Sequence, residues 1–389
     1  MQQGREREEH YGWVPFPGSK EILTFDQINF SHGEFSNDEN IFSGTMTFSL
    51  TVETDLHVGS GIFELSEDAG FPKGFVVRGA VKRNGVLVIP GSSLKGSIRS
   101  AYECITKSCL SKFEFGRKDN YSTTWNKSKI PAGLVRELTK GETRKEGKVK
   151  VFVDKEEKEI RGIKTCPEVE DPRSIKLCPG CALFGAMGYL GRLSFSDALP
   201  TTPIGDKSPL RIASANSPHL HTAGVPEVKD KGSIQVSHLK GRRVYYRQRQ
   251  IKGGTEPIDY IPKGTVLKFK VGFENVTGEE LGGVFTAMGL DLGAPLCFRI
   301  GGGKPLGLGE VQFHLLEMDY LTEGHVRSSF LSFDLKMSTP ENLSQFIKEK
   351  IQSFRKSSMF FEDGLKEFSH ITMKTAHAER RPRYGRGRF

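Results

Sequence analysis

The sequence predicts an α+β protein with a ferredoxin-like core, and two observations lead to that prediction. Stretches of alternating apolar and polar residues indicate strands, and stretches with apolar residues three or four positions apart indicate helices. With two long insertions set aside, these stretches follow the order strand, helix, strand, strand, helix, strand, which is that of a ferredoxin-like domain. A chain of 389 residues is long enough to bury a sizeable core.

Local patterns define the first half of this core. Residues 45–54 alternate between hydroxyl and apolar side chains, as a half-buried strand does. Short strands are expected at 75–77 and 86–89, the second after an Asn-Gly turn. A helix is expected to begin at Ser92 or Ser93, with a serine as its N-cap and with apolar residues repeating at helical spacing.

The second half of the core follows the insertions. Strands are expected at 192–197 and at 266–273, the latter after a Pro-Lys-Gly turn. A helix at about 277–290 and a strand at 311–315 complete the predicted order. One more helix is expected near 340–355, beyond the core.

The predicted domain plan places the core at 43–318. Insertions at 108–182 and 199–262 interrupt it, because both are poor in the periodic patterns of core elements. Residues 1–42 form an N-terminal extension, and residues 319–389 form a C-terminal extension that ends in a basic tail.

Charge and cysteine content narrow the function classes. The sequence has 56 lysines and arginines against 47 acidic residues, a net charge of +9, which favours an anionic partner such as nucleic acid. No apolar run approaches the roughly 20 residues of a membrane span, and the N-terminus is too polar for a secretory signal. Six cysteines, several of them clustered, suit a metal site in a reducing cytoplasm. We therefore expect a cytoplasmic protein without a membrane partner.

The cysteine spacing predicts a zinc knuckle within the first insertion. Cys178 and Cys181 form a C-x-x-C pair, and Cys166 precedes them by twelve residues. Cys109 is the preferred fourth ligand, and Cys104 is the alternative. An all-thiolate site is usually closed, so a structural zinc is favoured over a catalytic one.

Two glycine- and lysine-containing segments are candidate phosphate-binding sites. At the start of the first helix, Ser92, Ser93, Lys95 and Arg99 surround free amides that suit a phosphate, although an ordinary capped helix would look the same. In the glycine loop, defined as Gly301–Gly309, the candidates are Gly302, Gly303 and Lys304. Its five glycines can expose amides to a ligand or form a flexible surface turn.

A third candidate segment combines positive charge with aromatic rings. Residues 238–252 contain six lysines or arginines and no acid, which is a mixture that single-stranded nucleic acid favours. A solvated basic hairpin is the alternative. The candidate contacts are Lys240, Arg242, Arg243, Tyr245, Tyr246 and Arg247.

Several of these blocks together resemble the RAMP superfamily of CRISPR RNA-binding proteins, in particular the backbone subunit of type III effector complexes. The blocks are Thr54–Gly61, Pro90–Gly96, Gly191–Asp197 and the glycine loop, and the resemblance spans about residues 45–316. It implies an RRM-like palm with a protruding thumb in part of 199–262. The C-x-x-C knuckle resembles those of type III-D and III-E backbone units.

The resemblance also implies a set of partners. Such subunits bind a CRISPR guide RNA, stack as copies along it and present it to target RNA, with each thumb interrupting the duplex at intervals of about six nucleotides. Other effector subunits would complete the complex. Where the backbone does not cut, as in type VII, a separate nuclease would do so.

The resemblance also bears on catalysis. Many type III backbone subunits cut target RNA with a loop aspartate, but the matching place here, Phe71–Phe75, holds no carboxylate. Glu67 and Asp68 lie just upstream and are weak candidates, which would need Mg²⁺. A guide-processing ribonuclease that uses His57 is a further hypothesis, although a histidine at a strand end is more often structural.

Overall fold

The protein is described by a computed structural model, and the described residues are 11–17, 25–26, 40–109, 122–126, 148–152, 166, 176–213, 224–229, 233–239, 241–247, 249–250, 253–290, 298–321 and 337–373. Lys240 and the basic tail lie outside these ranges.

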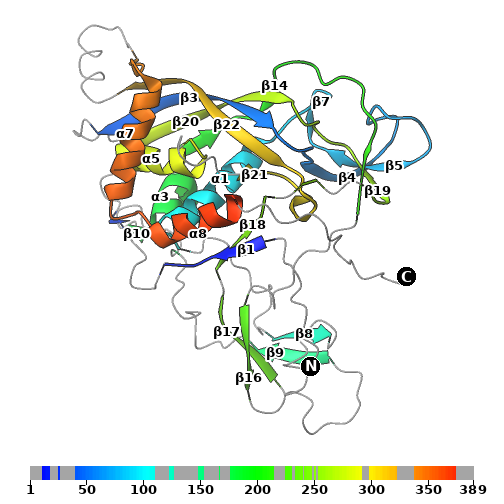
Figure 1. The fold of residues 1–389 in the computed structure, drawn as a ribbon, viewed down its shortest axis with the longest axis horizontal. Helices are drawn as coiled ribbons and strands as arrows, with labels where there is room; N and C mark the ends of the chain where they lie inside the picture. Colours follow the sequence, from blue (N-terminus) through cyan, green and yellow to red (C-terminus); the bar gives the residue numbers. More distant parts are fainter. Residues whose placement is uncertain are drawn as a thin grey trace.

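A central antiparallel sheet forms the core of the molecule (Figure 1). Its strands run in the order β13 (Leu193–Phe195), β20 (Val266–Thr277), β3 (Ile41–Val52), β22 (Glu310–Leu321) and β21 (Phe298–Arg299). The short strand β14 (Leu199–Pro200) also pairs with β20. Helix α1 (Gly91–Ile105) follows β3 along the chain, and α5 (Gly278–Ala287) follows β20. The predicted ferredoxin-like order is therefore confirmed.

Alternation of buried and exposed residues explains why the central strands form. Along β20, exposed and buried residues alternate over most of the strand, as the two faces of a sheet require. Phe48 of β3 lies directly opposite Phe269 of β20, and their rings stack with centroids 5.3 Å apart. Such cross-strand aromatic pairs help to fix the register of a sheet.

Helix α1 buries the apolar face predicted for it, but its N-terminus differs from the prediction. The N-cap residue is Pro90, whose own side chain cannot cap the helix, so the predicted serine cap is wrong. The Gly91 amide donates instead to Oδ1 of Asp197, 2.8 Å away. A Cβ on residue 91 would lie only 2.1 Å from the Phe195 carbonyl oxygen, so glycine lets the helix start against the neighbouring strand.

Helix α5 begins with a capping box. Thr277 and Glu280 exchange hydrogen bonds between side chain and backbone, which satisfies amides at the helix start. Glu280 also forms a buried ion pair with Arg192. This pair holds the helix start against the chain segment that leads into β13.

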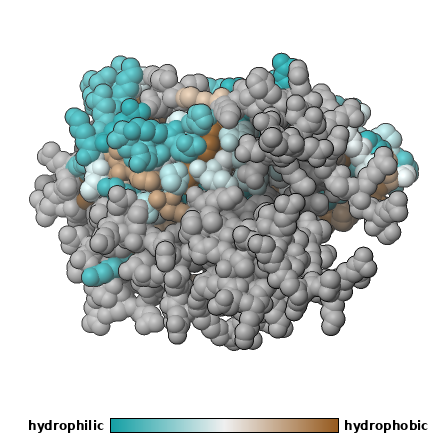
Figure 2. All heavy atoms as spheres, turned by 60° about the horizontal axis from the view of Figure 1, so that its bottom comes forward, coloured by the Kyte–Doolittle hydropathy of each residue, from teal (hydrophilic) through white to brown (hydrophobic). Residues whose placement is uncertain are grey.

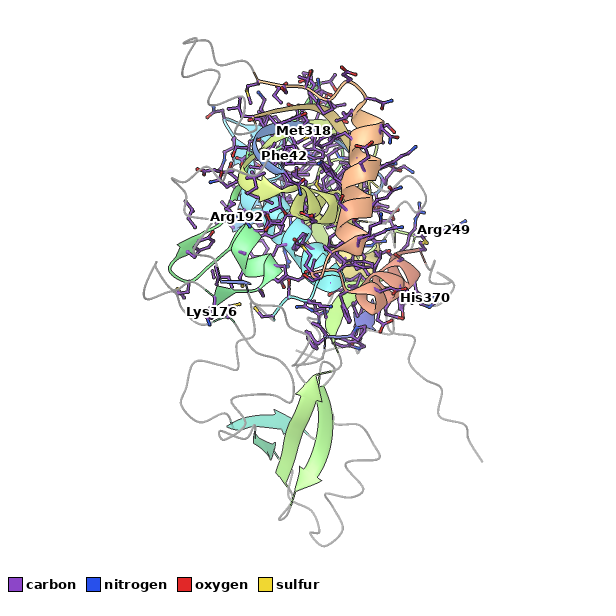
Figure 3. The ribbon with its side chains drawn as sticks, turned by 90° about the vertical axis from the view of Figure 1, so that its left-hand side faces the viewer. Phe42, Lys176, Arg192, Arg249, Met318 and His370 are labelled. Atoms are coloured by element: carbon purple, nitrogen blue, oxygen red, sulfur yellow. The ribbon has the colours of Figure 1, made fainter. Side chains whose placement is uncertain are left out.

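Two C-terminal helices pack on the core. Helix α7 (Leu343–Lys356) was predicted, whereas α8 (Glu362–Met373) was not. Their buried residues, which include Phe354 and Ile371, belong to the same hydrophobic cluster as the central sheet. Figure 3 shows both helices along one side of the core. In Figure 2, hydrophilic surface gathers at the upper left, where α7 lies in Figure 1.

Two smaller sheets lie beside the core (Figure 1). One runs in the order β15 (Leu210–Ile212), β19 (Glu256–Ile258), β5 (Val76–Ala80) and β4 (Gly59–Leu65). The other runs in the order β16 (Gly224–Lys229), β17 (Ser233–Leu239), β9 (Lys148–Phe152) and β8 (Ser122–Asn126). Strands β17 and β9 pair in parallel, so the two predicted insertions meet in one sheet.

The remaining elements are short pairs and turns. Strand β1 (Tyr11–Val14) pairs with β18 (Arg242–Tyr245), which joins the N-terminal region to the second insertion. The other pairs are β2 (Phe25–Asp26) with β10 (Lys176–Leu177), β6 (Lys82–Arg83) with β7 (Val86–Leu87), and β11 (Gly185–Ala186) with β12 (Tyr189–Leu190). Helix α3 (Pro179–Phe184) precedes β11, and the 3-10 helix η3 (Lys304–Leu306) lies within the glycine loop. Among the described helices, none is long and apolar enough to cross a membrane.

Candidate metal centre and nucleic-acid interface

Four cysteines converge at the start of α3, beside the segment that follows α1. The Sγ atoms of Cys109, Cys166, Cys178 and Cys181 all lie within 4.8 Å of one another, and those of Cys109 and Cys181 are 3.6 Å apart. These are the four preferred ligands predicted from the sequence. Soft thiolate donors in a set of four suit zinc. The cluster could therefore bind a metal ion such as zinc.

Cys104, the alternative ligand, lies elsewhere. It is buried on the core face of α1, and burial raises the pKa of its thiol to about 12. Cys109 follows the end of α1, where the chain leaves the core, and is therefore able to turn towards the other cysteines.

Backbone amides surround the cysteine sulfurs. The Cys178 amide donates to Cys166 Sγ at 3.2 Å, and the Cys181 amide donates to Cys178 Sγ at 3.5 Å. Hydrogen bonds from Cys109, followed by those from Cys166 and Cys181, lower the pKa of the Cys178 thiol. Pro179 occupies the first turn of α3, where a missing N–H costs nothing. The two amide hydrogen bonds favour the thiolate forms of Cys166 and Cys178, whereas hydrogen bonds with the neighbouring sulfurs, and then burial, raise the pKa of Cys109 and of Cys181.

Two arginines form hydrogen bonds at the cysteine cluster. Arg99 donates to Cys181 Sγ at 3.4 Å, to the Gly185 carbonyl at 2.9 Å and to Glu103 at 2.7 Å. Arg242 donates to the carbonyls of Ser108 and Cys109, at 2.9 and 2.7 Å. Positive charge here would offset the excess negative charge of four thiolates around a divalent ion. The Arg99 guanidinium is turned towards the cysteines. Its predicted contact with RNA stays a prediction.

The helix N-terminus predicted to meet phosphate already holds a carboxylate. The Gly91 amide and then Arg83, whose Nε lies 2.9 Å from the carboxylate, hold the pKa of Asp197 below its usual value. Lys95 donates to the Leu193 carbonyl at 3.1 Å, and burial lowers its pKa. Of the two candidate serines, Ser92 is exposed and Ser93 is half-buried.

The glycine loop folds against the segment around His57. The Gly302 amide donates to the His57 carbonyl at 2.8 Å, the Gly309 amide to the Asp55 carbonyl at 3.0 Å, and the Gly307 amide to the Lys304 carbonyl at 3.1 Å. Gly303 adopts a left-handed conformation with φ of 69°. These three amides already donate to protein carbonyls, and the RNA contacts of Gly302, Gly303 and Lys304 stay predictions.

The basic segment and the glycine loop come together in space. A Cβ on Gly307 would lie 2.6 Å from the Arg249 carbonyl oxygen. The side chain of Gln250 donates to Asp55 Oδ2 at 2.8 Å and accepts from the Asp55 amide at 3.2 Å. Burial, with the positive charges of Arg299 and Arg243, lowers the pKa of Lys304 to about 8. Two segments predicted separately as RNA contacts thus lie side by side. We call the place where Arg243, Arg299 and Lys304 meet the positive region, although Glu310 within it pairs with Arg299 and Arg247.

Side chains alternate along β18, so the residues predicted to contact RNA lie on two different faces of the strand. Arg242 is buried towards the cysteine cluster, whereas Arg243 is exposed, with its guanidinium near the ring of Tyr245. Tyr246 packs against the hydrophobic core. Arg247 is exposed and pairs with Glu310 at 2.9 Å. Figure 3 shows Lys176 of β10 and Arg249, which follows β18 along the chain, on opposite sides of the core.

His57 is part of a buried polar cluster. Its Nδ1 lies 2.7 Å from the Asp259 carbonyl oxygen, and burial lowers its pKa. The Asp259 carboxylate pairs with Lys207 and with Lys82, which also contacts Glu64. Sequence reasoning did not anticipate Asp259, because its partners come from distant segments.

The weak catalytic candidates lie in the turn between β4 and β5. Glu67 and Asp68 are both exposed. The Asp68 amide donates to the Leu65 carbonyl at 3.1 Å, and the Glu67 carbonyl accepts from the Gly70 amide at the same distance. The carboxylates stand on a hydrogen-bonded turn, open to solvent.

Comparison with known proteins agrees with the fold and the sequence blocks. The family model of the RAMP superfamily matches residues 49–312, which is more than half of the chain. No curated protein matches the sequence closely enough to be reported. The match covers the end of β3, the start of β22, all of β13, β20 and β21, both α1 and α5, the cysteine cluster, β18 and the glycine loop. The chain belongs to the RAMP superfamily, whose members are in general RNA-binding subunits of CRISPR-associated complexes.

Proposed function

We propose that this chain is a backbone subunit of a CRISPR RNA-guided effector complex, of type III, III-D-like or type VII. It binds guide RNA, assembles as copies along it and displays it for pairing with target RNA in antiviral defence. One observation carries the proposal: within a RAMP-family fold, the glycine loop and the basic segment meet in a positive region. Other effector subunits complete the complex.

The charge of this region suits a phosphate backbone. Arg243 and Lys304 interact electrostatically, and both are cations. Like charges held together raise each other's free energy, and a bound polyanion relieves that repulsion. An RNA strand along β18 and the glycine loop would neutralise both side chains.

Zinc has a structural role in this proposal. Four thiolates fill a tetrahedral shell and leave no position for a reacting water. Cys109 lies at the start of the first insertion, and Cys178 and Cys181 lie at its end. A bound zinc ion would tie the two ends of the insertion together and thereby set where the insertion leaves the core.

The thumb is assigned to part of the second insertion. Its hairpin of β16 and β17 belongs to a sheet beyond the core (Figure 1). A projecting hairpin has the shape needed to interrupt a guide–target duplex. The role stays a proposal, as do the domain boundaries.

A target-RNA endoribonuclease is the second candidate, and the exposure of Glu67 and Asp68 favours it. Carboxylates open to solvent can recruit Mg²⁺ beside a bound strand. The guide-processing hypothesis receives less support, because His57 is buried and its Nδ1 contacts a backbone carbonyl.

The decisive experiment starts from the chain purified with its native CRISPR locus. Bound nucleic acid is extracted and sequenced, and complementary RNA is then added with Mg²⁺. Recovery of guide RNA supports the backbone role, and absence of guide RNA contradicts it. Regularly spaced cuts that disappear in the double variant Glu67→Gln/Asp68→Asn would make this chain the nuclease. Cuts that persist in that variant would point to another residue or to a separate nuclease.

A further inference from the structure

Strands β1 and β18 form a two-stranded ribbon with two different faces. In its antiparallel register, Tyr11 lies opposite Tyr245 and Trp13 lies opposite Arg243. Directly opposite residues point to the same side of a sheet, and alternate residues along a strand share a side. Tyr11, Trp13, Arg243 and Tyr245 therefore occupy one face, which we call the aromatic face.

The aromatic face is arranged as a group of flat surfaces around a cation. The ring centroids of Tyr11 and Trp13 are 5.4 Å apart, those of Tyr11 and Tyr245 are 6.1 Å apart, and both pairs meet edge to face. The Arg243 guanidinium lies 5.6 Å from the Tyr11 ring centroid and 5.5 Å from that of Tyr245. The three rings are half-buried, and Arg243 is exposed.

The opposite face of the ribbon is firmly supported. Gly12 packs so closely on α8 that a Cβ there would lie 2.7 Å from the Ile371 side chain. Val14 is fully buried, and Arg242 is hydrogen-bonded to the Cys109 carbonyl. The rings are thus held on a rigid base, which lowers the entropic cost of ordering them around a ligand.

The surroundings of the aromatic face favour an anionic, ring-containing ligand. None of its four residues is acidic, and Arg243 acts electrostatically on Lys304 of the glycine loop. Bases of single-stranded RNA have flat faces and carbonyl acceptors, and the adjoining phosphates carry negative charge.

We propose that the aromatic face of β1 and β18 is a stacking site for a base of single-stranded RNA, with Arg243 and Lys304 holding the adjoining phosphates. This inference rests on the proposed RNA-binding function and extends it to a specific site. Tyr11 and Trp13 belong to a region that the sequence predicted to be an extension outside the core.

Tryptophan fluorescence tests the proposal directly. The chain has two tryptophans, Trp13 and Trp125, so Trp125→Phe leaves Trp13 as the single reporter. The full-length variant, freed of nucleic acid at high salt, is titrated with a ten-nucleotide oligouridylate and with the corresponding oligoadenylate. Saturable quenching of Trp13 is expected with both, because stacking is tolerant of base identity.

Substitutions in the aromatic face complete the test, with affinity followed by anisotropy of labelled RNA. Tyr245→Leu should weaken binding roughly five- to hundredfold, whereas Tyr245→Phe should retain it. Arg243→Gln, at an exposed position, serves if the leucine variant unfolds, and it should weaken binding and flatten its salt dependence. Phe63→Leu is the matched control, because Phe63 is an exposed ring beside Arg78 on a different sheet.

The outcomes distinguish the proposed stacking site from the proposed RNA-binding function of the whole chain. Tight RNA binding without Trp13 quenching, unchanged by Tyr245→Leu and Arg243→Gln, would overturn the stacking site and leave the proposed function intact. Loss of self-association without loss of RNA affinity in these variants would assign the face to a protein contact and overturn it too. Absence of RNA binding in the parent protein would remove both proposals.

Discussion

At the scale of single residues, neighbouring side chains decide which member of a chemically similar pair has a role. Cys104 and Cys109 are five positions apart, yet one is enclosed by the core and the other faces three more thiols. The same distinction applies to Arg242 and Arg243, which point to opposite faces of one strand. Residue type alone does not separate such pairs.

The cysteine pair gives a residue-scale prediction. Cys181→Ser should abolish stoichiometric zinc binding, because an alcohol is a poor zinc ligand, and should lower the thermal midpoint. Cys104→Ser should keep its zinc, although a buried hydroxyl will cost some stability. Elemental analysis of the purified proteins measures zinc content. Equal zinc loss in both variants would contradict the assigned ligand set.

Asp197 gives a prediction of pH dependence. Its pKa is lowered in the folded protein, first by the Gly91 amide and then by Arg83. Its stabilising effect is therefore present above the unfolded-state pKa of about 4, and it is lost as the pH falls through the lower folded-state pKa.

The variant Asp197→Ala should consequently lose about 1 kcal/mol of unfolding free energy at pH 7, as expected for removal of a helix cap. The difference from the parent should shrink as the pH falls below about 4, where the carboxyl group becomes protonated. Urea denaturation at several pH values measures it. A constant difference across that range would contradict the assigned role.

At the scale of elements, close approach between backbones fixes how α1 meets its neighbours. Helix α1 begins where Gly91 meets the Phe195 carbonyl, and α8 lies close enough to α1 that a Cβ on Gly364 would be 2.1 Å from the Cys104 carbonyl oxygen. The cysteine cluster, in turn, is linked to β18 through Arg242. Elements far apart in sequence thus constrain one another.

Two glycines of α1 should respond oppositely to alanine. Gly91→Ala should destabilise the protein by more than 1 kcal/mol, because its Cβ would overlap the Phe195 carbonyl. Gly96→Ala, on the exposed side of the same helix with nothing within 4 Å of its Cβ, should stabilise by about 0.5–1 kcal/mol. Thermal or chemical unfolding of the two variants would show the difference, and equal effects would refute the packing argument.

The link between the cysteine cluster and β18 predicts coupling between metal and RNA. Chelation of zinc should free the Cys109 segment, loosen Arg242 and weaken RNA binding as well as lower the thermal midpoint. Hydrogen exchange of the amides in residues 241–247 should accelerate in the chelated protein. Restoration of zinc should reverse both effects. Unchanged exchange in this strand would show that the two sites are independent.

At the scale of the whole molecule, net charge governs association more than folding. The charge of +9 is compatible with many folds, but it favours an anionic partner and makes affinity sensitive to ionic strength. The positive region at β18 and the glycine loop gives part of that charge a defined location.

RNA affinity should therefore fall steeply with added salt. If about four phosphates are neutralised on a single strand, raising monovalent salt from about 50 to 200 mM should weaken binding roughly fiftyfold. Anisotropy titrations at several salt concentrations give the slope directly. A slope near zero would exclude phosphate contacts as the main source of affinity.

The order of the elements and the C-x-x-C pair could both be predicted, because their signals are local. Strand and helix periodicity in β3, β20 and α1 follows from backbone geometry and one-sided burial, which neighbouring residues reveal. The C-x-x-C spacing likewise reflects what one tight turn can bring to a metal. Helix α8 could not be predicted so readily, because its buried residues match a surface supplied by α1.

The sequence by itself thus determined the α+β order, the C-x-x-C pair with Cys166, and the basic and aromatic composition of residues 238–252, and it left the fourth ligand open between Cys109 and Cys104. Only the tertiary structure decided that Asp197 caps α1, that Arg99 turns to Cys181 and that Tyr11 and Trp13 join Arg243. The physical reason is distance along the chain. Periodicity and propensity act over a few residues, whereas these partners are brought together only when the whole core packs.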